Sequence, residues 1–388
     1  MDLGQWLAVG RSVHADPRRA GREAAEAARA GDSAALVIVF SSEQSEPAEM
    51  LAGVADVFPG VPLIGCSSQS VIAPDGLDGP GVVVTALGGP GFATGTANAA
   101  AAGGAQRDAG AAVAACVADL DSALPHRVLI LLTDGSLGGQ EEILSGVYGV
   151  VGASIPLVGG NCGPDPALGH GYQLHGREVL TGSVVAAVIA SDRPFGIGVG
   201  HGCRKVGEPM IVTSSAQGEV HTLDDQPALH AYLGRLGAPA EAYTDKQAFD
   251  AFTRSRPIGI NRRSGEEVRH VRFVGEPDGR FRSSGAIPEG GLIWVMEGDR
   301  QSTLEAATEA CRAAVDNLDG HKPLGLMAFD CISRSRVLGE DGTRQEVERM
   351  VKEAVDVPLA GFYTWGEIAR TRGITGYHNQ TLVVLAIA

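Results

Sequence analysis

The chain has 388 residues, of which 44% are hydrophobic and 20% charged, a composition typical of a soluble globular protein with two or three domains. Its formal net charge of -15 disfavours two function classes, sequence-independent binding of nucleic acid and docking on an anionic membrane, because both need a basic surface. No apolar run approaches the roughly 20 residues that span a bilayer, and the first 13 residues do not resemble a signal peptide. Six scattered cysteines without a C-x-x-C pair are typical of a reducing compartment. We therefore expect a cytoplasmic protein without membrane insertion.

A short phrase of Pro, two apolar residues and Gly occurs three times along the chain, at 62–65, 156–159 and 358–361. Each copy follows a predicted helix. Upstream of that helix lie an alanine-rich helical stretch and an apolar run, and a second apolar run follows the phrase. The alanine-rich stretches cover 17–30, 105–120 and 303–318, the first runs 36–42, 128–135 and 324–331, the helices 47–58, 140–151 and 344–355, and the last runs 82–87, 183–189 and 381–387. This self-similarity predicts one supersecondary unit that is used three times.

The order of these segments predicts an α/β protein of mixed sheets covered by helices, built from repeated strand-helix-strand-helix-strand-strand units. Continuous apolar runs are typical of strands that are covered on both faces, and the paired strands after each phrase indicate that the sheets are not purely parallel. We expect two domains, 1–218 with two units and a hairpin, and 219–388 with the third unit. Equivalent loops of the three units are expected to gather around a shared region, which is the first place to look for a ligand.

A different stretch, 195–296, separates the second unit from the third. Strands are predicted at 196–202, at 210–215 and 219–223 around a turn at Gln217-Gly218, and at 268–274 and 292–297, with a turn at Asp278-Gly279. A helix is predicted at 226–236, with Pro227 in its first turn. The segment 239–256 is left with two alternatives, a loop that covers a site or an additional helix.

Several ordered motifs resemble those of a known family. Residues 200–209 (GHGCRKVGEP) resemble its middle motif, and 225–228 (DQPA) resemble the start of its C-terminal half. The most complete match is AGFYTWGEI at 360–368, which HNQTLVV follows at 378–384. Together they resemble the FIST family, with an N-terminal and a C-terminal FIST domain over nearly the whole chain. The resemblance implies a sensory protein that binds a small ligand, with an amino acid as one candidate. It also implies a separate signalling partner such as a histidine kinase, a cyclic-di-GMP enzyme or a chemoreceptor.

Two charged residues of the third unit are predicted to line one ligand pocket, because loops at the carboxyl ends of strands form ligand crevices in α/β sheets. Glu367 could pair with a ligand amine, or it could accept hydrogen bonds from the amides of its own loop. Arg334 could clamp a ligand carboxylate, or it could form a surface ion pair with Glu340 or Asp341.

Four further residues are candidates for ligand binding. Asn161 and Asn379 could face a cavity or cap backbone groups of their own loops. Tyr363 and Trp365 lie two residues apart, so on a strand they share one face. They could form a platform for a ligand or pack in the core.

The family resemblance also leaves open a haem-binding nitric oxide sensor. Its axial ligand would be a histidine beside an apolar pocket, and His378 is the first candidate, before His201 and His230. Catalysis is not expected. The chain has no Gly-x-Ser-x-Gly elbow and no phosphate-binding Gly-x-x-x-x-Gly-Lys loop, although a pair of Cys331 with His378 stays open as a nucleophilic site. Zinc is not expected either, because no third ligand lies near His201 and Cys203.

Overall fold

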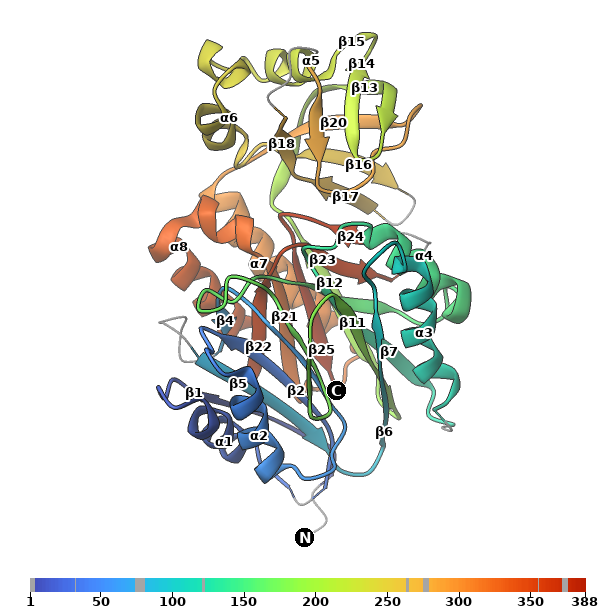
Figure 1. Ribbon diagram of the computed structural model, residues 1–388, viewed down its shortest axis with the longest axis vertical. Helices are drawn as coiled ribbons and strands as arrows, with labels where there is room; N and C mark the ends of the chain where they lie inside the picture. The colour runs from blue at the N-terminus through green and yellow to red at the C-terminus, as the bar shows by residue number, and fades with distance from the viewer. Residues whose placement is uncertain are drawn as a thin grey trace.

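A computed structural model describes residues 4–31, 33–73, 81–120, 123–262, 265–274, 279–354, 356–371 and 376–388. Within these residues three α/β units follow one another along the chain, and a separate β-sheet body, here called the insert, interrupts the third unit (Figure 1). In Figure 1 the insert forms the upper end of the molecule. No helix in the described ranges is long and apolar enough to cross a membrane.

The three units contain similar elements in the same order. The first consists of β1 (Trp6–Ser12), α1 (Pro17–Ala27), β2 (Ala34–Ser42), α2 (Pro47–Val57), β3 (Leu63–Ser67), β4 (Val71–Ile72) and β5 (Gly81–Gly88). The second consists of β6 (Phe92–Ala100), α3 (Gln106–Ala118), β7 (His126–Asp134), α4 (Gln140–Val151), β8 (Leu157–Cys162), β9 (Gln173–His175), β10 (Glu178–Leu180) and β11 (Ser183–Ser191). The third consists of β12 (Phe195–Gly200), α7 (Arg300–Asp316), β21 (Gly325–Cys331), α8 (Ile332–Glu353), β22 (Leu359–Thr364), β23 (Glu367–Arg370), β24 (Tyr377–His378) and β25 (Leu382–Ile387).

The sheets of the three units have the same strand order: β1-β5-β2-β3, β6-β11-β7-β8 and β12-β25-β21-β22. In each sheet the last two strands of this order are parallel and the other neighbours are antiparallel. The helix pairs α1/α2, α3/α4 and α7/α8 pack on one face of their own sheet. The prediction of an α/β fold with mixed sheets covered by helices is therefore confirmed.

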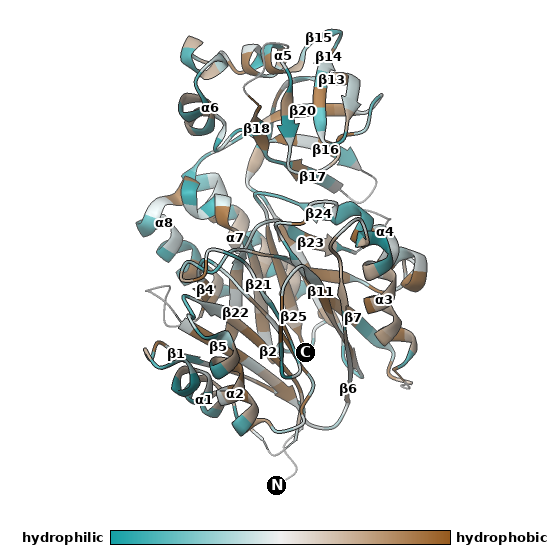
Figure 2. Ribbon diagram, in the orientation of Figure 1, coloured by the Kyte–Doolittle hydropathy of each residue, from teal (hydrophilic) through white to brown (hydrophobic). Residues whose placement is uncertain are grey.

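Each unit also contributes a short strand to the sheet of another unit. β4 of the first unit pairs with β22 of the third, β9 of the second with β3 of the first, and β23 of the third with β8 of the second. The three units are thereby linked in a closed ring. The opposite faces of their sheets share one core, in which the rings of Phe40, Phe329 and Phe362 touch each other. Figure 2 shows that this central region is strongly hydrophobic.

The glycine of each Pro-x-x-Gly phrase lies where two parallel strands approach closely. The phrases lie between the end of a helix and the start of a strand in all three units. A Cβ atom on the glycine would lie about 2 Å from the carbonyl oxygen of the residue opposite it on the partner strand. The pairs are Gly65 with Val39 (2.2 Å), Gly159 with Leu131 (1.9 Å) and Gly361 with Ala328 (2.0 Å). No other residue fits at these positions without a backbone shift.

The insert consists of β13 (Cys203–Ala216), β14 (Glu219–Leu223), β15 (Gln226–Pro227), α5 (Ala228–Arg235), the 3-10 helix η1 (Ala240–Tyr243), α6 (Lys246–Thr253), β16 (Ile258–Arg262), β17 (Gly265–Arg269), β18 (Val271–Phe273), β19 (Phe281–Ser283) and β20 (Leu292–Gly298). Its strands run in the order β17-β16-β20-β13-β14-β19-β18 and enclose their own core. The chain enters the insert at Cys203 and leaves it at Gly298, which lie opposite each other in the β13–β20 pair.

Some predictions for this stretch need correction. The strand predicted at 268–274 is two strands, because the backbone of His270 bonds to Ser284 instead of continuing one ladder. The helix predicted at 226–236 begins only at Ala228, since Pro227 pairs with β14. The segment 239–256 forms η1 and α6, the helical alternative. The turn predicted at Asp278-Gly279 lies partly outside the described residues.

The predicted hairpin around Gln217-Gly218 is present, and β13 and β14 pair on either side of it. The division into 1–218 and 219–388 falls within this turn and stays a prediction. The helix predicted at 344–355 is the second part of α8, which already begins at Ile332 and is kinked at Gly339 (φ 67°). This early start positions the residues that follow β21 for the site described next.

Candidate functional site

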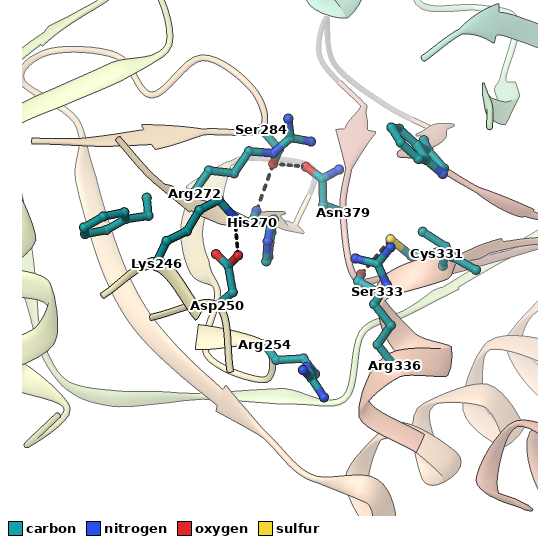
Figure 3. Close-up of a pocket in the computed structure, with 13 residues that line it drawn as sticks. Lys246, Asp250, Arg254, His270, Arg272, Ser284, Cys331, Ser333, Arg336 and Asn379 are labelled. Carbon is teal, nitrogen blue, oxygen red and sulfur yellow. Dashed lines mark hydrogen bonds and ion pairs between the residues drawn. The ribbon is translucent and has the colours of Figure 1, made fainter. Parts of the chain in front are cut away.

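A cavity of about 630 Å³ lies between the insert and the third unit (Figure 3). This volume is in the range of pockets that bind small molecules. The wall from the third unit consists of residues at the ends of β21 and β22, on α8 and before β25: Cys331, Ile332, Ser333, Arg336, Trp365 and Asn379. The wall from the insert consists of residues of α6, β18 and their neighbouring loops: Lys246, Asp250, Arg254, His270, Arg272, Phe273 and Ser284.

Cationic side chains outnumber anionic ones around this cavity. Lys246 forms an ion pair with Asp250 four residues later on α6, so these two charges compensate each other. Figure 3 shows no hydrogen bond or ion pair from the guanidinium groups of Arg254, Arg272 or Arg336 to another lining residue. Three arginines around one cavity are a strong anion-binding feature, because each guanidinium presents several donors in a planar fork.

Neutral polar groups lie between the two cationic walls. The thiol of Cys331 is 2.9 Å from Ser333 Oγ, and Ser284 Oγ is hydrogen-bonded to Asn379 Oδ1. Burial, and next the nearby carboxyl of Glu367, raise the pKa of the Cys331 thiol. The thiol is therefore protonated at neutral pH and is a weak nucleophile.

His270, between β17 and β18, is held at the cavity by one residue of the insert and one of the third unit. Its backbone N–H donates to Ser284 Oγ (2.9 Å), and Gln380 Nε2 lies 3.3 Å from its ring Nδ1. Burial above all, and then the charge of Arg272, lower the pKa of His270 to about 4; Asp250 acts against this shift and Arg336 adds to it. The imidazole is therefore neutral at pH 7, and with Nδ1 accepting from Gln380 its proton resides on Nε2.

Arg334 is enclosed beside the cavity and does not line it. Its side chain is 2% exposed, and Nε lies 2.9 Å from Asp330 Oδ1. The guanidinium also contacts Glu346 (3.2 Å from Nε) and donates to the carbonyl oxygen of Thr303 (3.0 Å). These buried partners replace the surface ion pair with Glu340 or Asp341 that was one alternative. The donors of Arg334 are thus already engaged by the protein.

Glu367 is also buried beside the cavity wall and does not line the cavity. Its carboxyl is hydrogen-bonded to Thr364 Oγ1, and the backbone N–H of Thr381 donates to Oε2 (3.2 Å). Burial raises the pKa of Glu367 to about 8, against the opposing effect of these hydrogen bonds and of the Cys331 thiol. The backbone amide that donates to Glu367 is that of Thr381, ahead of β25, and not one of its own loop, so the protein engages this carboxyl in another way than the stated alternative.

The other four candidates for ligand binding are divided between the cavity and the core. Trp365 and Asn379 line the cavity. Tyr363 is 1% exposed and packs between the sheet and the helices of the third unit. Asn161 lies in a buried network, where Thr133 Oγ1 is 2.7 Å from its Oδ1. Tyr363 and Trp365 therefore do not form one platform, since β22 ends between them.

The loops that follow the strands of the three units do meet, as expected. Trp365 N donates to the carbonyl oxygen of Asn161 (2.9 Å), and Ser68 Oγ donates to that of Tyr363 (2.7 Å). Ser67 Oγ likewise donates to the carbonyl oxygen of Gly163 (3.0 Å). At this meeting point the loops are mostly hydrogen-bonded to each other. Of the three units, only the third contributes loop residues to the cavity wall.

The histidines considered as haem ligands lie away from the cavity. His378 is 9% exposed, its Nε2 lies 3.2 Å from the carbonyl oxygen of Ala369, and burial lowers its pKa to about 4. His201 accepts from Cys203 N (3.0 Å) and borders a space of only about 10 Å³. His230 is exposed on α5. Among the residues that the structure describes, none of these three histidines borders a large apolar pocket of the kind that holds a haem.

Comparison with known proteins assigns the two halves of the chain to one family. A model described as the FIST N domain matches residues 35–226, and one described as the FIST C domain matches residues 228–370. The chain belongs to the FIST family. FIST domains are sensory domains in signal transduction.

Similar proteins are found in mycobacteria. The uncharacterized protein Rv0628c of Mycobacterium tuberculosis is 27% identical over 395 residues, and the uncharacterized protein Mb0898c of Mycobacterium bovis is 26% identical over 402 residues. Both alignments cover 97% of this chain and 97% of the relative. A crystal structure of cyanuric acid hydrolase from A. caulinodans aligns with a TM-score of 0.29 at 12% identity, over 48% of this chain and 71% of that one. A TM-score this low does not establish a shared fold.

The cavity of this FIST protein contains residues that sequence reasoning missed. Arg254, Arg272 and His270 belong to the insert, which offered no motif for a binding site. Arg336 lies two residues beyond Arg334, on the helix that directly follows β21. The available signal was this helix start at the carboxyl end of a buried strand. It directed attention to Arg334, whereas Arg336 is the arginine of this helix that lines the cavity, because helical spacing decides which side chain faces outward.

Proposed function

We propose that this FIST protein is a cytoplasmic sensor that binds a small anionic metabolite in the cavity between its insert and its third unit. The single observation that supports the proposal best is the set of three arginines that lack a carboxylate partner among the lining residues. An amino acid, bound through its carboxylate, belongs to the ligand class that such a cavity suits. Trp365 and Asn379 remain candidates for contact with the ligand.

Signal output is proposed to pass through a separate protein, such as a histidine kinase, a cyclic-di-GMP enzyme or a chemoreceptor. The two FIST matches together span 35–370, and a sensory domain by itself has no catalytic output. Residence in the cytoplasm is in keeping with the free thiols of all six cysteines.

Binding without catalysis is part of the same proposal. The protonated state of the Cys331 thiol argues against a nucleophile in the cavity. His378, the partner considered for it, does not line the cavity, and neither does any of the other histidines considered as haem ligands. A haem-based sensor therefore finds less support than a sensor of small anions.

A thermal shift screen of anionic metabolites tests the proposal. A ligand at 100 times its dissociation constant stabilises the folded state by about 2.7 kcal/mol, which is readily detected as a rise in Tm. The Arg336→Ala variant should lose that rise. Arg344→Ala is the matched control, because Arg344 lies on the same helix, is exposed and is absent from the cavity wall. If no anion raises Tm, or if both variants respond like the parent protein, the proposed site is wrong.

A further inference from the structure

The two walls of the cavity carry excess positive charge separately. Arg336 comes from α8 of the third unit, whereas Arg254 and Arg272 come from the insert (Figure 3). Because His270 is neutral and Lys246 is compensated by Asp250, the remaining charge on each wall is that of arginine. A ligand with a single anionic group can neutralise one wall and leaves the other facing it with uncompensated charge.

The lining of the cavity also includes apolar surface. Ile332 and Trp365 present apolar surface from one side and Phe273 from the other, and the Cys331 thiol adds a weakly polar group. Apolar surface of this kind suits a short carbon chain, since the burial of carbon atoms there is favourable. The cavity therefore has arginines on both walls, and the rest of its lining combines apolar side chains with the neutral polar groups described above.

We propose that the ligand carries two separate anionic groups on a short carbon chain, one bound by Arg336 and the other by the arginines of the insert. This inference rests on the proposed function and narrows it to a ligand class. A dicarboxylate and a phosphate ester that also has a carboxylate share this chemistry. Such a ligand places an anionic group against each wall and connects the insert with the third unit.

The negative charge of the whole protein opposes the binding of anions, so it bears on which anions the arginines can hold. With a formal charge of -15, the molecule repels anions at long range. An anion therefore gains its affinity from direct contact with the arginines. A second anionic group increases the affinity only if its own contacts with arginine outweigh the additional long-range repulsion. Arginine forks on both walls can provide that contribution, because charge-assisted and bidentate hydrogen bonds are the strong ones.

Glutarate and pentanoate are suitable probes, because both have five carbons and differ in one carboxylate. Titration calorimetry and thermal shift at low ionic strength should show that glutarate binds at least about tenfold more tightly than pentanoate, the ratio that 1.4 kcal/mol produces. Its affinity should also fall more steeply with added NaCl. A third probe, 3-phosphoglycerate, tells whether a phosphate with a carboxylate is preferred over a dicarboxylate.

Variants on the two walls distinguish a bridging ligand from one that uses a single wall. Arg336→Ala and Arg272→Ala should each reduce the affinity for the preferred dianion at least about tenfold, towards that of pentanoate. Arg344→Ala on α8 and Arg282→Ala on the insert are the matched controls, since both arginines are exposed and neither lines the cavity.

Three outcomes are decisive. Tighter binding of a probe with two anionic groups that depends on arginines of both walls supports the inference. Equal binding of glutarate, 3-phosphoglycerate and pentanoate, or dependence on one wall only, overturns the ligand with two anionic groups and leaves the proposed anion sensor in place. If none of the probes nor any metabolite of the anion screen binds, the inference and the proposed function both fail.

Discussion

Arg334 and its two carboxylate neighbours form a charge cluster with almost no access to water. Asp330 and Glu346 are both 0% exposed and contact the same guanidinium. Burial, and then the charge of Glu346, raise the pKa of Asp330 well above its usual range. Asp330 therefore keeps its proton to a higher pH than an exposed aspartate does, which limits the number of charges in such a buried group.

Removal of the cation from this cluster should destabilise the fold. We expect Arg334→Ala to lower the free energy of unfolding by about 3–5 kcal/mol, because it leaves a buried carboxylate without its partner. Urea unfolding followed by circular dichroism measures this change. Arg336→Ala, on the same helix but exposed, should change stability by no more than about 0.5 kcal/mol. A loss of ligand affinity without loss of stability in Arg334→Ala would instead assign Arg334 to the binding site.

Glu367 makes stability depend on pH in the neutral range. Its pKa is about 8 in the folded state, above the ordinary value of 4.5, so between these values the folded protein holds a proton that the unfolded chain has released. Stability therefore decreases as the pH rises from about 5 to 8, by at most about 1.4 kcal/mol per pH unit for one proton. Below the ordinary value this contribution is fully present.

The Glu367→Gln variant tests this assignment, because it keeps the shape of the side chain and removes the titration. The decrease in the unfolding free energy between pH 5 and 8 should become smaller by this contribution. Denaturant unfolding at several pH values measures the slope. Glu340→Gln is the control, since Glu340 is 91% exposed on α8. An unchanged slope in Glu367→Gln would show that Glu367 is ionised in the folded protein.

At the scale of elements, the close contact of parallel strands explains why each phrase ends in glycine. In Gly361→Ala the new Cβ would lie 2.0 Å from the carbonyl oxygen of Ala328, which is backbone and cannot rotate away. We expect a loss of about 1–3 kcal/mol in the unfolding free energy, the usual range for added volume in a packed core. Urea unfolding checks this value.

A matched substitution should have the opposite sign. Gly149 lies in α4, and a Cβ there would meet no atom within 4 Å. Gly149→Ala should therefore stabilise the protein by up to about 1 kcal/mol through helix propensity. If Gly361→Ala were as stable as the parent, the strands would not need the close approach that the structure shows.

Most of the long elements were predicted from the sequence, although β1 and β6 were not located, and the short strands were missed for a physical reason. Helices such as α2 and α4 and strands such as β2 and β7 have periodic or continuous apolar patterns, which are local signals. β4, β9 and β23, the strands that pair with the sheet of another unit, are only two to four residues long. Pairing at such a distance along the chain leaves no local pattern.

The candidate site was predictable only in part. The family motif at 360–368 and the strand end at Cys331 directed attention to the correct end of the third unit, and Trp365 and Asn379 do line the cavity. The other wall comes from the insert, whose residues meet this end only because the insert folds back over it. The predictions for Arg334 and Glu367 could not be decided by spacing, since burial determines whether a charged group serves a ligand or the protein.

At the scale of the whole molecule, the position of the insert follows from the architecture of the ring. In the first two units, the first strand connects to the first helix through 13–16 and 101–105. In the third unit the corresponding connection is the insert, between β12 and α7. The ring is thus complete without the insert, which adds the second wall of the cavity to one unit.

The direct pairing of Cys203 with Gly298 has a consequence for how such sensors could diversify. The two points at which the insert is attached are neighbours across one antiparallel pair, so the host chain is continuous across them. The insert also contacts the host through bonds such as those of Arg269 to Tyr377 and of Ser284 to Asn379. Exchange at such a position leaves the host backbone in place. A chimaera with the insert of another FIST protein should thus keep the ring and acquire a new ligand preference, which would let recognition and output evolve separately.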